Sequence, residues 1–257
     1  MWLIAGPCVI EDDKMPFMVA EELVKIAKEL DLNFIFKSSY LKANRSKLDS
    51  FRGIPRINAL EILKEIHNTY HIPVITDVHE SWECEEVAQY VDYLQIPAFL
   101  CRQTELLLSA GKTGKPINIK KGQFMSPESM QFAIDKVKST GNNNIFLTER
   151  GSMFGYYNLV VDMTAIPRMK SFGYPVLIDA THSVQMPNHN DGVTHGLRDY
   201  VPTIALAGIA AGADGIFMEV HPDPQSALSD AETQWPLNNA FDLLKKIKNL
   251  YSSVNNL

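Results

Sequence analysis

Residues 59–78 read ALEILKEIHNTYHIPVITDV, and this stretch decides the fold class. In its first half, leucines and isoleucines recur at the helical period, which predicts a helix with one apolar face over 59–68. The run PVITDV at 73–78 is short, β-branched and apolar up to Asp77, as expected of a strand covered on both faces. The stretch is therefore a helix followed by a buried strand whose end is polar.

Outward from this stretch, strand-like and helical segments alternate along the whole chain. A second helix is predicted over 18–30, where Val19, Leu23 and Ile26 share one stripe. Eight strand-then-helix units without a linker-like gap predict a (β/α)8 TIM barrel in a single catalytic domain over 1–257, with an open doubly wound sheet as the alternative. The eight expected strands are 2–6, 33–38, 73–78, 92–96, 116–120, 144–148, 175–180 and 214–220.

Charge and composition narrow the class of protein. The chain has 257 residues, of which 46% are hydrophobic and 21% charged, and a formal net charge of −6. Its 24 Lys and Arg residues are spread out, so we expect neither a nucleic-acid nor a membrane partner. No stretch approaches the roughly 20 apolar residues that span a bilayer. Three widely spaced cysteines are poor material for a disulfide framework, so a cytoplasmic location is expected.

Polar side chains follow the predicted strands, at the end where barrels place their chemistry. Six of them are cations in an otherwise acidic chain, and such groups satisfy phosphate and carboxylate oxygens in a dry cleft. One loop cation is often merely solvated, but six around one rim predict a small, highly anionic substrate. The six are Lys37, Lys42, Arg45, Lys120, Lys121 and Arg150.

Four residues of metal-ligand type, Cys8, His182, Glu219 and Asp230, lie far apart in the sequence. No two have the spacing of a compact metal motif. In a barrel, however, the ends of the first, seventh and eighth strands are neighbours, so these side chains can meet. Taken alone, Cys8 is more often a small buried apolar group than a ligand. His182 and Glu219 fit a ligand, an acid–base group or a structural hydrogen-bonding group.

Blocks at the strand ends together resemble the 3-deoxy-D-manno-octulosonate 8-phosphate synthase family over nearly the whole chain. Among them are IAGPCVIE (4–11), FKSSYLKANRSKLDSFRG (36–53), NIKKGQFMSP (118–127) and DATHSVQMP (179–187). This family condenses phosphoenolpyruvate with D-arabinose 5-phosphate and releases phosphate, which supplies a sugar of Gram-negative lipopolysaccharide. The resemblance thus implies a transferase with these two substrates.

The resemblance also implies roles for individual residues. Family members are homotetramers in which the arginine of FLCRQT, here Arg102, reaches a neighbouring subunit's sugar phosphate. The implied substrate-binding residues are Lys37, Asn44, Arg45, Ser46, Arg102, Lys120 and Arg150. The implied catalytic residues are Lys42, Lys121, His182 and Asp77.

Position 8 bears on the cofactor. The family divides into metal-dependent members with cysteine here and metal-independent members with asparagine, so the resemblance implies a divalent metal ion. Its ligands would be Cys8, His182, Glu219 and Asp230. A thiolate, an imidazole and two carboxylates suit Zn²⁺, Fe²⁺ or Mn²⁺, and the sequence does not choose among them.

The chain departs from the family at Lys47, where relatives often have a second serine, and at 186–200, which lacks the usual run of glycines. The runner-up is the related 3-deoxy-arabino-heptulosonate 7-phosphate synthase, which uses erythrose 4-phosphate. Its corresponding loop tends to read KPRTS, so KANRS at 42–46 argues against it. Two other classes stay open: a Schiff-base aldolase with Lys120 as nucleophile, and a barrel that only binds ligands.

Overall fold

The computed structural model describes residues 1–257 except 46, 154–157, 188–194 and 256–257. Its parallel strands close into an eight-stranded barrel, because the last of them pairs back onto the first. The predicted (β/α)8 barrel is confirmed, and the open doubly wound sheet is wrong. In order around the barrel, the strands are β1 (Trp2–Gly6), β2 (Asn33–Lys37), β3 (Val74–Asp77), β4 (Tyr93–Ile96), β5 (Ile117–Lys120), β6 (Ile145–Glu149), β9 (Val176–Asp179) and β12 (Gly215–His221).

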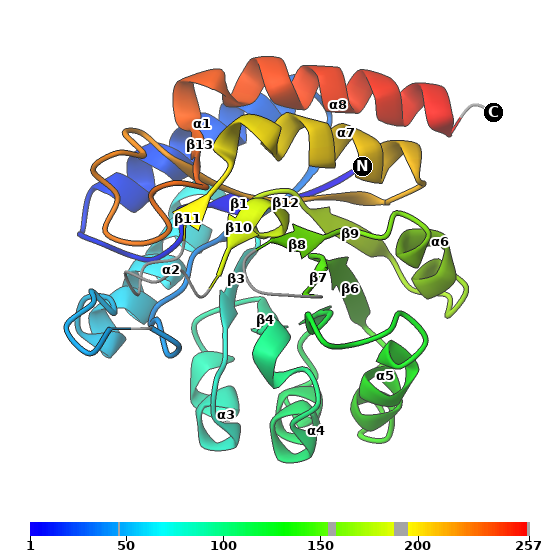
Figure 1. Cartoon of the computed structure of the whole chain (residues 1–257). Coiled ribbons are helices and arrows are strands. Elements are labelled where there is room, and N and C mark those ends of the chain that lie inside the picture. The colour runs from blue at the N-terminus through cyan, green and yellow to red at the C-terminus, as the bar shows by residue number, and fades with distance from the viewer. Residues whose placement is uncertain (46, 154–157, 188–194, 256–257) are drawn as a thin grey trace.

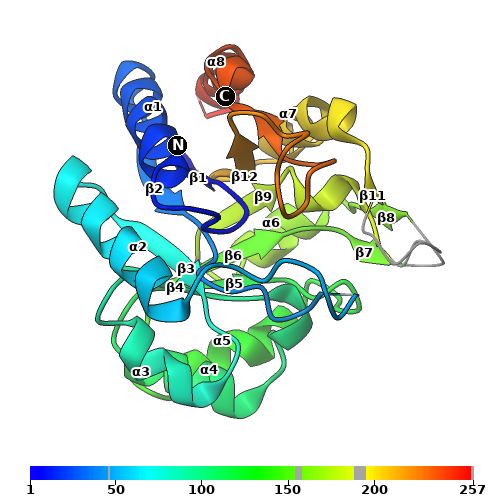
Figure 2. The same cartoon turned by 90° about the vertical axis from the view of Figure 1, so that its left-hand side faces the viewer.

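Helices surround the barrel, as Figure 1 and Figure 2 show. They are α1 (Met15–Glu29), α2 (Arg56–Tyr70), α3 (Cys84–Val87), α4 (Thr104–Lys112), α5 (Met130–Lys138), α6 (Ala165–Lys170), α7 (Val201–Ala210) and α8 (Ala240–Val254). α1, α7 and α8 cover one side of the barrel, and α3, α4 and α5 cover the opposite side. No helix of the described residues combines the length and the apolar character needed to cross a membrane.

The two helices predicted from periodicity both form and are longer than predicted. α1 begins at Met15 because Pro16 suits the first turn, where its missing N–H has no partner to lose. Oδ1 of Asp12 also accepts the backbone N–H groups of Lys14 and Met15, each at 2.7 Å. α2 extends beyond 59–68 at both ends. Apolar periodicity therefore located both helices, and Asp12 and Pro16 favour the start of α1 at Met15.

Short elements that the sequence did not predict lie mostly in the loops after the strands. The two-residue strands form an antiparallel pair after β6, another after β9, and an extension beside β12. They are β7 (Ser152–Met153), β8 (Leu159–Val160), β10 (Gln185–Met186), β11 (His195–Gly196) and β13 (Trp235–Pro236). The 3₁₀ helices are η1 (Ser81–Glu83), η2 (Ala98–Leu100), η3 (His182–Val184), η4 (Arg198–Tyr200) and η5 (Leu237–Asn239).

The inside of the barrel has an apolar layer below a polar one. Side chains of a strand alternate between its two faces, so residues two apart point the same way. Each apolar interior residue of four strands is followed two positions later by a charged one. The pairs are Ile35 and Lys37, Ile75 and Asp77, Leu177 and Asp179, and Phe217 and Glu219. The strands therefore place charged groups inside the barrel at its carboxyl end, on an apolar floor.

Candidate active site

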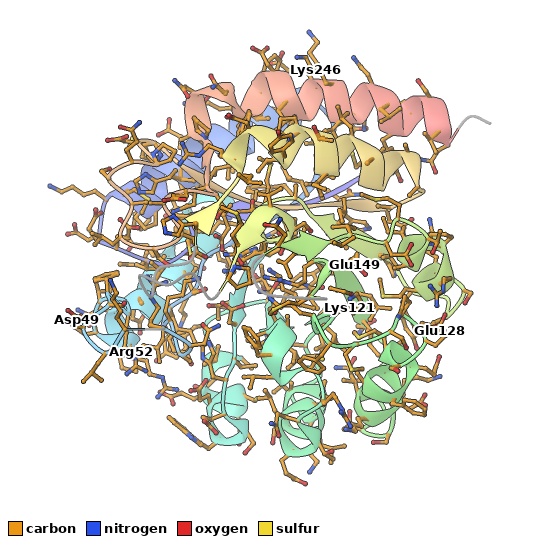
Figure 3. All side chains as sticks on the ribbon, viewed as in Figure 1. Asp49, Arg52, Lys121, Glu128, Glu149 and Lys246 are labelled. Carbon is orange, nitrogen blue, oxygen red and sulfur yellow. The ribbon has the colours of Figure 1, made fainter. Side chains whose placement is uncertain are left out.

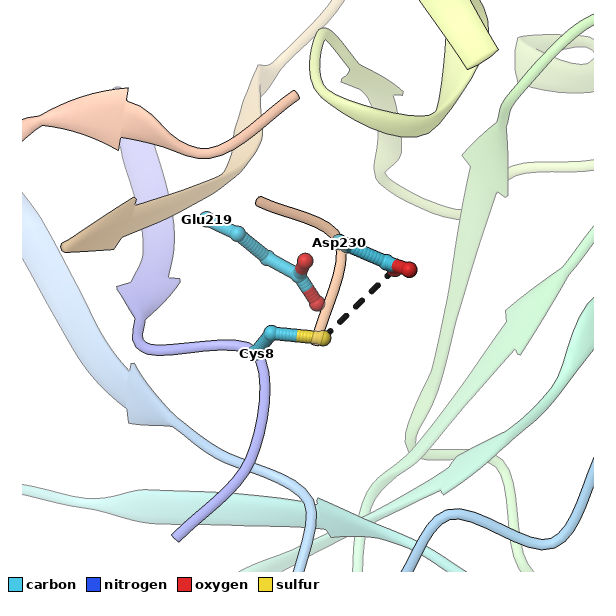
Figure 4. Close-up of side chains that lie close together, drawn as sticks. All are labelled: Cys8, Glu219 and Asp230. Carbon is cyan, nitrogen blue, oxygen red and sulfur yellow. Dashed lines mark hydrogen bonds between the residues drawn. The ribbon is translucent and has the colours of Figure 1, made fainter. Parts of the chain in front are cut away.

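Three residues of metal-ligand type meet at this polar end. Cys8 follows β1, Glu219 lies on β12, and Asp230 lies in the loop before β13 (Figure 4). One ligand atom from each lies within 4.8 Å of the other two. The thiol of Cys8 donates to Oγ of Ser229 at 3.1 Å and to Oδ2 of Asp230 at 3.5 Å. Closure of the barrel between β12 and β1 thus joins residues more than 200 positions apart.

His182 faces the same cluster from η3. Its Nε2 lies 3.5 Å from Oε1 of Glu219 and 3.8 Å from Oδ2 of Asp230. Its Nδ1 lies 2.8 Å from Oδ2 of Asp179, which lies on β9. A carboxylate that accepts from Nδ1 fixes the ring orientation and leaves the Nε2 lone pair free to bind a cation.

The donor set fits a divalent cation. Both carboxylate oxygens of Glu219 are buried and have no hydrogen-bond partner among the described residues, which is costly for a charged group. Burial, and after it the nearby Asp230 and Glu219, raises the pKa of the Cys8 thiol well above its usual value. A bound cation would neutralise the carboxylates and favour the thiolate. The mixture of sulfur, nitrogen and oxygen donors suits a borderline metal.

Neighbouring groups hold Asp230 in place. Its φ of 46° lies in the left-handed region, where a non-glycine residue needs support from its surroundings. Gln185 donates to its Oδ2 at 3.2 Å, and Nη1 of Arg45 lies 3.8 Å from its Oδ1. Arg45 also donates to Oγ of Ser229 at 2.8 Å. The predicted cation Arg45 therefore lies directly beside the Cys8, Glu219 and Asp230 cluster.

Two of the predicted cations meet on one hydroxyl. Nζ of Lys37 and Nζ of Lys42 donate to Oγ of Ser39 at 2.9 and 3.1 Å. Ser39 in turn donates to Asp77. Burial alone would raise the pKa of Asp77, but Lys37 and Lys42 outweigh it and hold that pKa well below its usual range. Lys37 also lies 3.6 Å from Oε1 of Glu219, so this group adjoins the metal-type cluster.

Lys120 is buried at the end of β5. Its ammonium donates to Asp179 at 2.6 Å and lies 3.6 Å from the centre of the Phe217 ring. Burial lowers the pKa of Lys120 despite this carboxylate. Burial alone would raise the pKa of Asp179, but His182 and Lys120 outweigh it and hold that pKa low. Asp179 thus links the imidazole to this ammonium.

Lys121 and Arg150 form a second cationic region on the ends of β5 and β6. Lys121 lies 3.4 Å from Oε1 of Glu149 and donates to Oγ of Ser152 at 3.0 Å (Figure 3). Arg150 is only 5% exposed, and it makes no ion pair among the described residues. It donates to Gln185 at 3.0 Å, while its Nη1 is buried without a partner. A buried guanidinium in this state is a site for an anion.

Two other predicted residues, Asn44 and Arg102, are exposed. Arg102 lies in the loop between η2 and α4. The side chain of Arg102 makes no hydrogen bond or ion pair within the described parts of the chain. Ser46 lies outside the described residues.

Sequence reasoning missed several residues that complete the site. Ser39, Ser229 and Asn118 are hydrogen-bonded within it, and none was singled out. A signal existed for Asn118, because a polar residue interrupts the apolar run PINIK. No comparable signal marks Ser229, because the residues that it contacts, Cys8 and Arg45, lie far from it in the sequence.

A barrel whose carboxyl end combines buried cations with a cluster of metal-ligand type defines an enzyme for a small, highly charged substrate. The chain belongs to the DAHP synthetase I family, whose model matches residues 1–256, and within it to the 2-dehydro-3-deoxyphosphooctonate aldolases.

Curated relatives with that name match almost throughout. The protein of Francisella tularensis subsp. holarctica is 49% identical over 97% of this chain and 90% of its own length. That of Trichlorobacter lovleyi is 50% identical over 98% of this chain and 93% of its own. That of Dichelobacter nodosus is 50% identical over 98% of this chain and 91% of its own. 2-Dehydro-3-deoxyphosphooctonate is 3-deoxyoctulosonate 8-phosphate under another name, so the resemblance at the strand ends is confirmed, and the heptulosonate alternative is not favoured.

Proposed function

We propose that this protein condenses phosphoenolpyruvate with D-arabinose 5-phosphate and water, and releases 3-deoxy-D-manno-octulosonate 8-phosphate and inorganic phosphate. The observation that carries the proposal is the buried Arg150, which has an unpartnered Nη1 and no ion pair among the described residues. Such a group needs an anion, and it lies beside Lys121 at the barrel's carboxyl end. The protein acts in the cytoplasm as a single catalytic domain over 1–257 and supplies lipopolysaccharide synthesis.

Phosphoenolpyruvate binds to Lys121 and Arg150, with Lys37, Lys42 and Lys120 close by. Its C3 forms a bond to the aldehyde carbon of the sugar, and the aldehyde oxygen takes a proton from Lys42. Burial opposes the charge on Lys42, but the Cys8, Glu219 and Asp230 cluster raises its pKa, so Lys42 carries a proton. A cation bound at the cluster would offset these negative charges and make Lys42 a stronger acid. Water adds at C2 and gives up a proton to solvent. The resulting hemiketal phosphate loses phosphate through cleavage of the C–O bond: its C2 hydroxyl becomes the ketone and gives its proton to the departing phosphate, while the nearby cations stabilise the negative charge. Lys42 regains a proton from solvent.

Cys8, His182, Glu219 and Asp230 would hold a divalent ion, Zn²⁺, Fe²⁺ or Mn²⁺, which when bound would supply Lewis-acid chemistry to orient and polarise the aldehyde. Asp179 keeps the His182 ring oriented for that role. Asp77 holds Lys37 and Lys42 through Ser39.

The sugar phosphate binds to Asn44, Arg45 and Ser46, with Arg102 supplied by a neighbour in a homotetramer. Two observations support this assembly. Arg102 lies at a pocket of about 350 Å³, and Phe124 and Phe132 line that pocket while being 56% and 69% exposed. Large exposed aromatic side chains beside an unpaired arginine are typical of a protein interface.

Release of phosphate tests the proposal. With phosphoenolpyruvate and arabinose 5-phosphate, the metal-loaded protein should release phosphate, and with erythrose 4-phosphate it should release far less. Oxygen-18 in the bridging position of phosphoenolpyruvate should leave with the phosphate. A preference for erythrose 4-phosphate, or label retained in the sugar, would overturn the proposal.

A further inference from the structure

The hydroxyl of Ser39 has all of its hydrogen-bonding capacity in use. A serine hydroxyl has one hydrogen to donate and two lone pairs to accept with. Ser39 donates to Asp77 and accepts from Nζ of Lys37 at 2.9 Å and from Nζ of Lys42 at 3.1 Å. Its rotamer is therefore fixed, and the two ammonium groups are held around one oxygen atom.

The backbone of Ser39 is fixed as well. Its N–H donates to the carbonyl of Cys8 at 3.2 Å, and its carbonyl accepts from the N–H of Ile10 at 3.0 Å. These bonds form a parallel bridge between the segment after β2 and the segment after β1. Ser39 is fully buried, so solvent does not compete for its hydroxyl.

A chain of hydrogen bonds across the barrel orients Asp77 from its other side. Thr148 donates to Asn118 at 2.8 Å, Asn118 donates to Gln95 at 2.9 Å, and Gln95 donates to Asp77. The residues lie on β6, β5, β4 and β3 in turn. Every donor points toward the Asp77 carboxylate, which leaves its other oxygen to Ser39. Such buried, fully satisfied networks specify a single arrangement.

We propose that Ser39 is a positioning residue that places the ammonium groups of Lys37 and Lys42 for the reaction, with Asp77 and the Gln95, Asn118 and Thr148 chain fixing its hydroxyl. This inference rests on the proposed function, because the two lysines act on the substrates there. Loss of the Ser39 hydroxyl removes the hydrogen bond of each ammonium to that oxygen, and leaves Lys37 only the longer contacts to Asp77 and Glu219, at 3.5 and 3.6 Å.

Ser39→Ala tests the inference, and Ser38→Ala is the matched control. Ser38 is the adjacent residue, is equally buried, and its Oγ has no partner among the described residues. Ser39→Ala should lower kcat about 10- to 100-fold, the usual cost of removing a group that orients a reacting one. It should also raise the KM for phosphoenolpyruvate and leave the KM for arabinose 5-phosphate near that of the parent. Ser38→Ala should keep all three values.

A second variant and a second measurement keep the test independent of folding and of turnover. If Ser39→Ala does not fold, Ser39→Cys fills the space and keeps a donor toward Asp77, but sulfur is a weak acceptor, so the same loss is expected. Crystal structures should show both ammonium groups displaced in the Ser39 variant and unmoved in Ser38→Ala. Parent-like kinetics with unmoved lysines, or an equal loss in both variants, would overturn the inference. If the parent protein itself releases no phosphate, the proposed function fails, and the lysine positions alone decide the role of Ser39.

Discussion

At the scale of single residues, Cys8 has the least ordinary environment, since its thiol is buried between two carboxylates. Both carboxylate oxygens of Glu219 lack a hydrogen-bond partner among the described residues, and the Lys37 ammonium lies 3.6 Å away. The close approach of two carboxylates and a thiol is electrostatically unfavourable by itself, and it favours the binding of a divalent cation. The proposed roles of Cys8 and Asp230 as metal ligands thus rest on the same observation, the negative charge gathered at this cluster.

We predict that Cys8→Ala lowers the activity at least about 100-fold, because losing a metal ligand should cost more than losing a residue that only hydrogen-bonds to a ligand. Chelation should remove the activity of the parent protein, and an added divalent metal should restore it. Cys84→Ala is the control, because Cys84 is also buried and lies far from the cluster in α3. Full activity after exhaustive chelation, with no metal found by elemental analysis, would contradict the prediction. Cys8→Asn is the informative variant, since any metal-free turnover would show in it.

Arg150 leads to a second prediction. Arg150→Lys keeps the charge but loses the planar fork that binds phosphate or carboxylate through two bonds. We expect kcat/KM for phosphoenolpyruvate to fall about 100-fold, the scale expected when a substrate is misplaced by about 1 Å. Arg168→Lys is the control, because Arg168 pairs with Glu128 and Asp162 at the surface. Equal kinetics in both variants would argue against a direct role for Arg150.

At the scale of elements, η1 is anchored to the segment after β2 through a buried carboxylate. Glu83 accepts from the Tyr40 hydroxyl and, at 3.0 Å, from the His79 backbone N–H. Burial alone would raise the pKa of Glu83, but the bonds from His79 and Tyr40 outweigh it and lower the pKa to about 2. The anchor matters for the site because Tyr40 directly follows Ser39.

This anchor makes stability depend on pH in a defined window. The folded pKa of Glu83 lies below its unfolded value, so its stabilisation is complete above the unfolded pKa of roughly 4.3 and is lost as the pH falls through about 2. We expect Glu83→Gln to lower the free energy of unfolding by about 3 kcal/mol at pH 7, and the deficit to shrink below about pH 4. Urea unfolding at several pH values measures this. The exposed Glu85→Gln should change stability by less than about 0.5 kcal/mol. A deficit that does not vary with pH would show that Glu83 does not act through its charge.

The elements also show how far sequence reasoning reached. The strands could be predicted from short apolar runs. The side chains of four charged residues point into the barrel because each lies two positions beyond an apolar interior residue; they are Lys37, Asp77, Asp179 and Glu219. The hairpins β7–β8 and β10–β11 were missed because two-residue strands carry no periodic signal. Asp230 is held in its loop by hydrogen bonds from Gln185 and from the Cys8 thiol, and only closure of the barrel brings these groups together.

At the scale of the whole molecule, Arg102 is exposed and its side chain has no partner among the described residues, and its predicted role is in the site of a neighbouring subunit. Arg102→Ala and Cys8→Ala should each be nearly inactive. A mixture of the two, allowed to exchange subunits, should regain about a quarter of the parent activity, because a site with both groups can form between unlike subunits. The size of each variant should be checked by sedimentation, since the loss must not come from dissociation. No recovery in mixed tetramers of confirmed composition would show that Arg102 is not shared between subunits.

The apolar floor of the barrel determines the side from which substrates enter and products leave. Ile4, Ile35, Ile75, Leu177 and Phe217 are at most 1% exposed, and with Phe146 they fill the interior below the charged groups. Nothing as large as a sugar phosphate can pass through a layer packed this tightly. The charged groups above this layer can therefore be reached only from the carboxyl end of the barrel, so both phosphorylated substrates must enter, and both products must leave, on that side. The substrate that binds nearest the apolar floor must therefore bind first, and the product nearest the floor can dissociate only after the other product has been released.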